Sequence, residues 1–188
     1  MTGHDDQVGA LLPGHVAEQV VQEAPCTVLV MKSADKRQDA EMAPGSSPLR
    51  FRRMVVGYDH RAGARHALEM ACGLGSKQGC HITLVHAMEP APVFPECMES
   101  MHERDVCVHE ALDRLAQVRA QCLPEAHDWE LRVEMGEAWD VITRAAKDTR
   151  SDLIVVGPHE HTRWGHSYVG STAQWVVRQA QCPVLVVK

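Results

Sequence analysis

The sequence predicts an α/β fold in which helices cover both faces of one open, doubly wound, parallel sheet of five strands. Three observations predict this fold. Short apolar runs rich in valine recur through residues 52–188, stretches with helical spacing of apolar residues separate them, and glycine or proline stands at the junctions. Strands that alternate with helices connect in parallel through right-handed crossovers, which places helices on both faces of the sheet.

The five predicted strands differ in how apolar they are. In chain order they are "RMVVGYD" (53–59), "HITLVHAM" (81–88), "WELRVEM" (129–135), "DLIVVG" (152–157) and "PVLVV" (183–187). The third run alternates apolar and charged residues, which is typical of a strand nearer the edge of a sheet. The fourth run is almost entirely apolar, which indicates a central strand.

Four helices are predicted from apolar residues at helical spacing. The first follows the first strand in "RAGARHALEMACGLGSKQG" (61–79), and the second covers roughly residues 100–122, after a proline-rich loop at 89–97. The other two are marked by Val141, Ile142, Ala145 and Ala146, and by Ala173, Val176, Val177 and Ala180. Each helix therefore has one apolar face that can pack on the sheet.

Composition narrows the class of protein. Of 188 residues 45% are hydrophobic, which is enough for a core, and the formal net charge of −6 disfavours nucleic acid as a partner. No stretch approaches the ~20 apolar residues of a membrane span, and the first residues lack a secretory signal pattern. Seven cysteines without a C-x-x-C motif fit reduced thiols. These features predict a cytoplasmic protein that binds neither nucleic acid nor membrane.

An internal repeat links the two ends of the chain. "GHVAEQVVQEAPCTVLVMK" (14–32) aligns without gaps on "GSTAQWVVRQAQCPVLVVK" (170–188), with ten identical positions among nineteen. Residues 1–32 are therefore predicted to be the last helix and strand of a partial first copy of the domain at 52–188. Residues 33–51 between them, charged and then rich in Pro, Gly and Ser, are predicted to be a linker.

The last predicted strand is an apolar edge that invites pairing with another strand. This edge comprises Pro183, Val184, Leu185, Val186 and Val187, and the matching N-terminal residues are Cys26, Thr27, Val28, Leu29, Val30 and Met31. We expect the N-terminal strand to dock on the last strand, either within one chain or from a partner chain. The alternative is that residues 1–32 are a disordered remnant.

Candidate ligand-binding residues stand where the carboxyl ends of central strands meet. Asp59 and Gly157 follow two such strands, and ligands of open α/β sheets bind in the crevice at these ends. Gly170, Ser171 and Thr172 open the last helix, whose unsatisfied N–H groups attract an anion. The alternatives are that Ser171 only caps the last helix and that Asp59 only caps the first.

The domain at 52–188 resembles the universal stress protein family over its whole length. The matching segments, in the family's order, are "VVGYDHRAGARHALEMA", "TLVHAM", "GEAWDVITRAAKDTRSDLIVVG" and "GSTAQWVVRQAQCPVLVV". The resemblance implies a Rossmann-like fold of the adenine nucleotide alpha-hydrolase type, with strand order 3-2-1-4-5. It also implies a cytoplasmic stress-response protein that forms a homodimer through its last strand and that, in one branch of the family, binds ATP.

The ATP-binding branch carries the motif G-x(2)-G-x(9)-G-(S/T) and an aspartate after the first strand. Gly157, Gly170 and Ser171 match the motif, and Glu160 replaces its second glycine. The resemblance assigns Asp59 to the aspartate and Ala87 to a small residue against adenine. The full set of expected nucleotide-binding residues is Gly57, Asp59, Ala87, Val156, Gly157, His159, Glu160, Gly170, Ser171 and Thr172, with ATP or AMP as the ligand.

Glu160 opposes phosphate binding. Two like charges ~4 Å apart cost about 1 kcal/mol in water and about 4 kcal/mol near a protein surface, a tenfold to thousandfold loss of affinity. Neighbouring basic residues (His159, His161, Arg163 and His166) could offset the charge, and a Mg²⁺ ion bridging Glu160 and phosphate would reverse it. The alternative function is a dimerising interaction module that keeps the fold without the ligand.

The same loop could be interpreted as a metal site, because His159, Glu160, His161 and His166 are clustered in the sequence. Their spacing matches no known zinc motif, so a solvated loop is the favoured interpretation and no metal site is expected. Serine, cysteine and histidine residues also lack the spacing of a nucleophile and its base, so the chain is not expected to be an enzyme.

Overall fold

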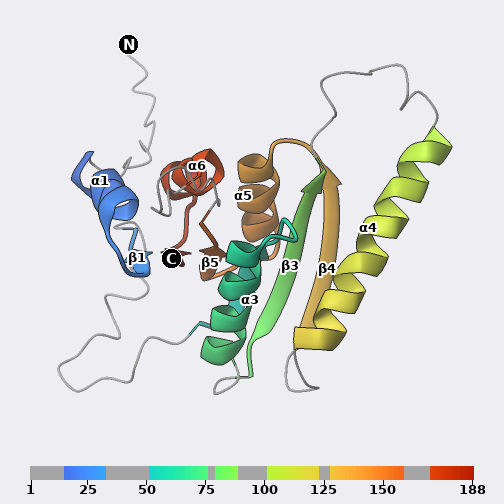
Figure 1. The fold of residues 1–188 in the computed structure, drawn as a ribbon, viewed down its shortest axis with the longest axis horizontal. Helices are drawn as coiled ribbons and strands as arrows, with labels where there is room; N and C mark the ends of the chain where they lie inside the picture. The colour runs from blue at the N-terminus through green and yellow to red at the C-terminus, as the bar shows by residue number, and fades with distance from the viewer. Residues whose placement is uncertain (1–14, 33–50, 76–78, 89–100, 123–127, 159–169) are drawn as a thin grey trace, which may run out of the picture.

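The computed structural model describes residues 15–32, 51–75, 79–88, 101–122, 128–158 and 170–188. Within these ranges one mixed sheet has the strand order β1-β6-β5-β2-β3-β4 (Figure 1). Its strands are β1 (Val28–Val30), β2 (Arg53–Gly57), β3 (His81–Met88), β4 (Asp128–Met135), β5 (Leu153–Val156) and β6 (Val184–Val186). Its helices are α1 (His15–Glu23), α3 (Ala62–Gly75), α4 (Met101–Cys122), α5 (Ala138–Asp148) and α6 (Ser171–Gln179).

The five strands of the domain pair as the sequence predicts. β2 lies between β3 and β5, β4 pairs with β3, and β6 pairs with β5, all in parallel. In the numbering of the predicted strands this is the order 3-2-1-4-5. The alternating strand β4 is at an edge and the apolar strand β5 is central, as expected from their patterns.

The prediction of a five-stranded, purely parallel sheet is wrong in one respect. A sixth strand, β1, pairs antiparallel with β6, so the sheet is mixed. Val28 lies opposite Val186, Leu29 opposite Leu185, and Val30 opposite Val184. The expected docking on the last strand therefore takes place within the chain, and the alternative of a disordered unit is wrong for residues 15–32.

Two apolar cores lie on opposite faces of the sheet because successive residues of a strand point to opposite sides. In β2, Met54 and Val56 pack with α3 and α4, whereas Val55 packs with α5 and α6. α1 joins the second core through Val21, which is only 1% exposed. Figure 1 shows α1 beside α6, at the end of the sheet opposite β4 and α4.

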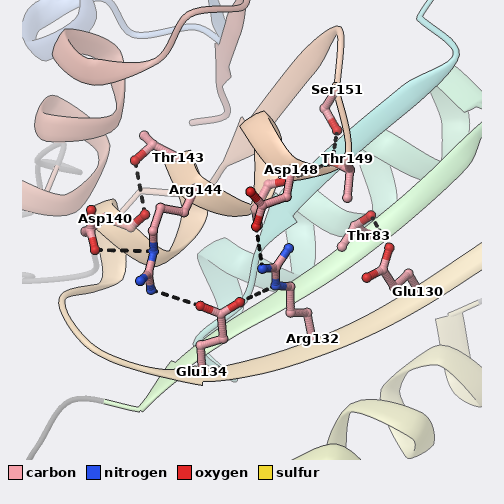
Figure 2. Close-up of polar contacts among 11 residues, drawn as sticks. Thr83, Glu130, Arg132, Glu134, Asp140, Thr143, Arg144, Asp148, Thr149 and Ser151 are labelled. Carbon is pink, nitrogen blue, oxygen red and sulfur yellow. Dashed lines mark hydrogen bonds and ion pairs between the residues drawn. The ribbon is translucent and has the colours of Figure 1, made fainter.

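Charged side chains connect α5 to the edge strand β4 (Figure 2). Arg132 donates to Asp148, with 2.6 Å between Nη2 and Oδ2, and also contacts Glu134. The second oxygen of Glu134 accepts from Arg144 Nη2 at 2.9 Å. Glu134 thus binds the guanidinium groups of both Arg132 and Arg144. Together with the pair between Arg132 and Asp148, these contacts tie α5 to β4, although the helix packs mainly on β2 and β3. The beginning of the same helix borders the pocket described below.

The cysteines with described side chains are free thiols: Cys26, Cys72, Cys80, Cys107 and Cys182. Burial raises the pKa of Cys80 to about 11, so this thiol stays protonated at neutral pH and is unreactive. Over the ranges that the structure describes, no helix has both the length and the apolar character needed to cross a membrane.

Candidate functional site

A pocket of about 300 Å³ opens at the carboxyl ends of β2, β3 and β5. Seven of the expected nucleotide-binding residues line it: Gly57, Asp59, Ala87, Val156, Gly157, Gly170 and Thr172. Asp59 and Gly157 therefore share one crevice, as the strand order requires. Ser171 begins α6 but is not a lining residue, and His159 and Glu160 lie outside the described residues.

Asp59 shapes the turn that leads from β2 into α3. Its Oδ1 accepts from the backbone N–H of Arg61 at 3.0 Å, two residues along, while its Oδ2 lies 3.8 Å from Arg61 Nε. α3 begins only at Ala62, so Asp59 is not the N-cap of this helix and that alternative is wrong. The Asp59 side chain is half exposed, at 49%, and the residue lines the pocket with the guanidinium of Arg61 beside its carboxylate.

Sequence reasoning missed Arg61, which lines the pocket together with Tyr58 and Pro158. The guanidinium of Arg61 brings positive charge to the pocket beside the carboxylate of Asp59. A guanidinium can also pair with phosphate oxygens. The available signal was its position two residues after Asp59, where an aspartate commonly bonds the backbone.

The first turn of α6 closes another side of the pocket. Gly170 is the N-cap residue, with φ −65° and ψ 161°, and as a glycine it has no side chain with which to cap this end of the helix. Ser171 is already the first helical residue, so the alternative that it caps α6 is wrong. The first N–H groups of a helix have no partner within the helix, and they carry its positive dipole end. Gly170 and Thr172 line the pocket, so this positive end borders it.

Gly157 is needed for packing whether or not a ligand binds. A Cβ placed on it would lie 2.8 Å from Ala64 N and nearer still to the backbone of Gly63. A Cβ on Gly63 would meet the carbonyl oxygen of Pro158 and lie 2.9 Å from its Cδ. The end of β5 and the start of α3 thus touch backbone to backbone, which sets the distance between two walls of the pocket.

Three aromatic rings cluster next to the pocket after β2. His86 Nδ1 lies 2.8 Å from the carbonyl oxygen of Tyr58, and the ring of His60 packs edge-on against both, with centroids 5.1 and 5.0 Å away. Burial, followed by the charges of His86 and Arg114, lowers the pKa of His60, with Asp59 acting in the opposite direction. His60 is therefore neutral at pH 7. Its φ of 64° is a backbone conformation that histidine adopts more readily than most residues.

Comparison with known proteins decides the family. The universal stress protein family matches residues 50–188, about three quarters of the chain. The chain belongs to the universal stress protein family. A family member from Thermus aquaticus is 30% identical over 143 residues, which cover 73% of this chain and 99% of that protein.

Solved structures of the family share the fold. A putative universal stress protein from Pseudomonas aeruginosa UCBPP-PA14 superimposes with a TM-score of 0.65 at 17% identity, over 99% of this chain and 60% of that one. Such coverage takes in α1 and β1 as well as the family domain. A universal stress protein solved in complex with cAMP gives a TM-score of 0.55 at 19% identity, over 74% of this chain and 99% of the other.

The histidine-rich cluster of His159, Glu160, His161 and His166, for which no metal site is expected, falls outside the described residues. In the part of the chain that the structure describes, no three His, Cys, Asp or Glu side chains are arranged to hold a metal ion. The interpretation of the histidine-rich loop therefore stays a prediction.

Proposed function

We propose that this chain is a stress-response protein without catalytic activity that binds an adenine nucleotide, ATP or AMP, in the pocket between β2, β5 and α6. The N-terminus of α6, where the N-cap residue is a glycine, carries the proposal. Gly170 supplies no side chain to bond the first N–H groups of the helix, and these groups border a pocket large enough for a small ligand. A phosphate is the ligand group that such a helix end binds best.

The other walls of the pocket suit the rest of a nucleotide. Asp59 Oδ2 can accept a hydrogen bond from a ribose hydroxyl, while Arg61 beside it balances phosphate charge. Val85 and Ala87 form an apolar wall at the end of β3, where an adenine ring can pack. The structural similarity to a family member solved with cAMP supports an adenine nucleotide over other anions.

Titration calorimetry with ATP and AMP, on the full chain and on Glu160→Gly, tests the proposal. We expect both proteins to release heat and Glu160→Gly to bind at least tenfold more tightly, because it removes a carboxylate from the expected phosphate loop. Adding Mg²⁺ should narrow this difference if the ion bridges Glu160 and phosphate.

The alternative function, an interaction module without a ligand, predicts a different result. No heat from the wild-type chain, with clear heat from Glu160→Gly, would mean that the pocket has kept its shape while the loop excludes nucleotide. No heat from either protein would contradict the assignment of this pocket to nucleotides.

A further inference from the structure

The N-terminal unit, defined here as α1 and β1 within residues 15–32, pairs with β6 as a second copy of β6 would. β1 and β6 have the same sequence, Val-Leu-Val. In the repeat Leu29 corresponds to Leu185, and these two residues lie opposite each other. The flanking valines exchange partners, with Val28 opposite Val186 and Val30 opposite Val184. Such reciprocal pairing is the signature of a two-fold symmetric contact.

Side chains around the strands repeat this symmetry to within one residue. Lys32 donates from Nζ to the carbonyl oxygen of Val177 in α6, and Lys188 donates from Nζ to that of Gln22 in α1, at 3.2 Å. Lys32 and Lys188 are equivalent positions of the repeat. Each lysine therefore crosses to the helix of the opposite unit, and burial lowers the pKa of both ammonium groups.

Among the residues that the structure describes, the N-terminal unit has neighbours on one side only. Val20 is 48% exposed, whereas its repeat equivalent Val176 is fully buried. Met31 is likewise 48% exposed, and its equivalent Val187 is fully buried. The described residues contain no counterpart of α5 and β5 packed against α1 and β1, so the unit is attached chiefly through β6 and α6. A unit with so few neighbours can leave more easily than β6 can.

We propose that the N-terminal unit occupies the self-pairing edge of β6 in place of a second copy of this chain, and so controls whether two copies dimerise. When the unit leaves, two β6 strands pair antiparallel with Leu185 opposite Leu185 of the partner subunit. This control of self-association is proposed for the edge of the sheet, and none of the residues that line the pocket belongs to β1 or β6.

One ion pair distinguishes the two arrangements. Arg178 donates from Nε and Nη2 to the two oxygens of Glu18, each at 2.7 Å, and its guanidinium lies 5.4 Å from the centroid of the Trp175 ring. In the repeat, Glu18 corresponds to Gln174. A dimer of two copies would therefore set Arg178 against a neutral Gln174 of the partner subunit. Glu18 thus favours the contact within the chain over the contact between chains.

Sedimentation equilibrium on the full chain tests the role of Glu18. We expect a monomeric wild-type chain and a dimer dissociation constant about fivefold lower for Glu18→Gln, the scale of a partly exposed ion pair. Glu23→Gln is the matched control, because it removes the same charge from an exposed position of α1 whose Oε1 accepts from Gln19 Nε2 within the same helix, and it should behave like the wild type. The double variant Glu18→Arg with Arg178→Glu restores the pair and should restore the monomer.

Cross-linking locates the dimer contact. Opposed residues of an antiparallel pair lie about 4.5–5.5 Å apart, within reach of a disulfide. Leu185→Cys combined with Glu18→Gln should therefore form a link between position 185 of two copies, identified by peptide mapping. The proposal is overturned if Glu18→Gln self-associates no more than Glu23→Gln. It is also overturned if Leu185→Cys alone, with Glu18 intact, already forms the link between two copies, or if Glu18→Gln dimers form without a link at position 185.

Discussion

Gly157→Ala is expected to destabilise the protein by about 2–3 kcal/mol, the upper range for overpacking, because its new methyl group would overlap backbone rather than a side chain that can rotate. The carbon would lie 2.8 Å from Ala64 N and closer to Gly63, so β5 and α3 must separate to admit it. Urea unfolding followed by circular dichroism measures the change as a lower midpoint at an unchanged slope.

Gly73→Ala is the control for this prediction. Gly73 lies exposed in α3, and a Cβ placed there meets no atom within 4 Å. We expect this variant to gain about 0.5–1 kcal/mol of stability, since alanine restricts the unfolded chain and favours the helix. If Gly157→Ala lowers the free energy of unfolding and Gly73→Ala raises it, the destabilisation at position 157 comes from its packing and not from the loss of a glycine as such. Equal effects would contradict the backbone contact with Gly63.

This packing changes how the family motif should be interpreted. The family motif assigns Gly157 to nucleotide binding, whereas a Cβ at this position would meet the backbone of Gly63 and Ala64. A glycine at position 157 would thus be retained in a chain that binds no ligand. The presence of Gly157 is therefore stronger evidence for the fold than for nucleotide binding. A test of binding must change a residue that the fold does not require.

The strand pattern predicted the domain well because each strand has a local signature. The alternation in β4 reflects its place at the edge, and the apolar run of β5 reflects burial on both faces. The resemblance to a known family then supplied the strand order. The pairing of β1 with β6 was also foreseeable, since the two strands share a sequence, but the repeat does not say whether a strand pairs within its own chain.

The site was predicted less completely because contacts across the sheet leave no local trace. Gly63 resembles any other small residue near a helix start, and its role comes from Pro158, almost a hundred residues further along. Arg61 carries no motif and enters the pocket through the turn that Asp59 shapes. The alternative that placed the cap of α6 at Ser171 is wrong by one residue, since glycine and serine both suit a helix start.

A substitution at Gly170, the N-cap residue of α6, can change nucleotide binding without destabilising the fold. Gly170 has φ −65° and ψ 161°, a conformation open to any residue, and aspartate is a better N-cap than glycine by a few tenths of a kcal/mol. Gly170→Asp should therefore leave the protein as stable as the wild type or slightly more stable. The same substitution brings a carboxylate to the first N–H groups of α6 and adds a negative charge where the phosphate is proposed to lie.

Calorimetry with ATP should then show affinity reduced by about a hundredfold to a thousandfold in Gly170→Asp, from repulsion of about 3–4 kcal/mol near a protein surface. Gly170→Asn is the matched control, because it caps the helix equally well without charge and should lose about tenfold through competition for the N–H groups alone. If both variants bound ATP as the wild type does, the phosphate could not lie at the start of α6. If they lost affinity equally, the helix N–H groups would matter and the charge would not.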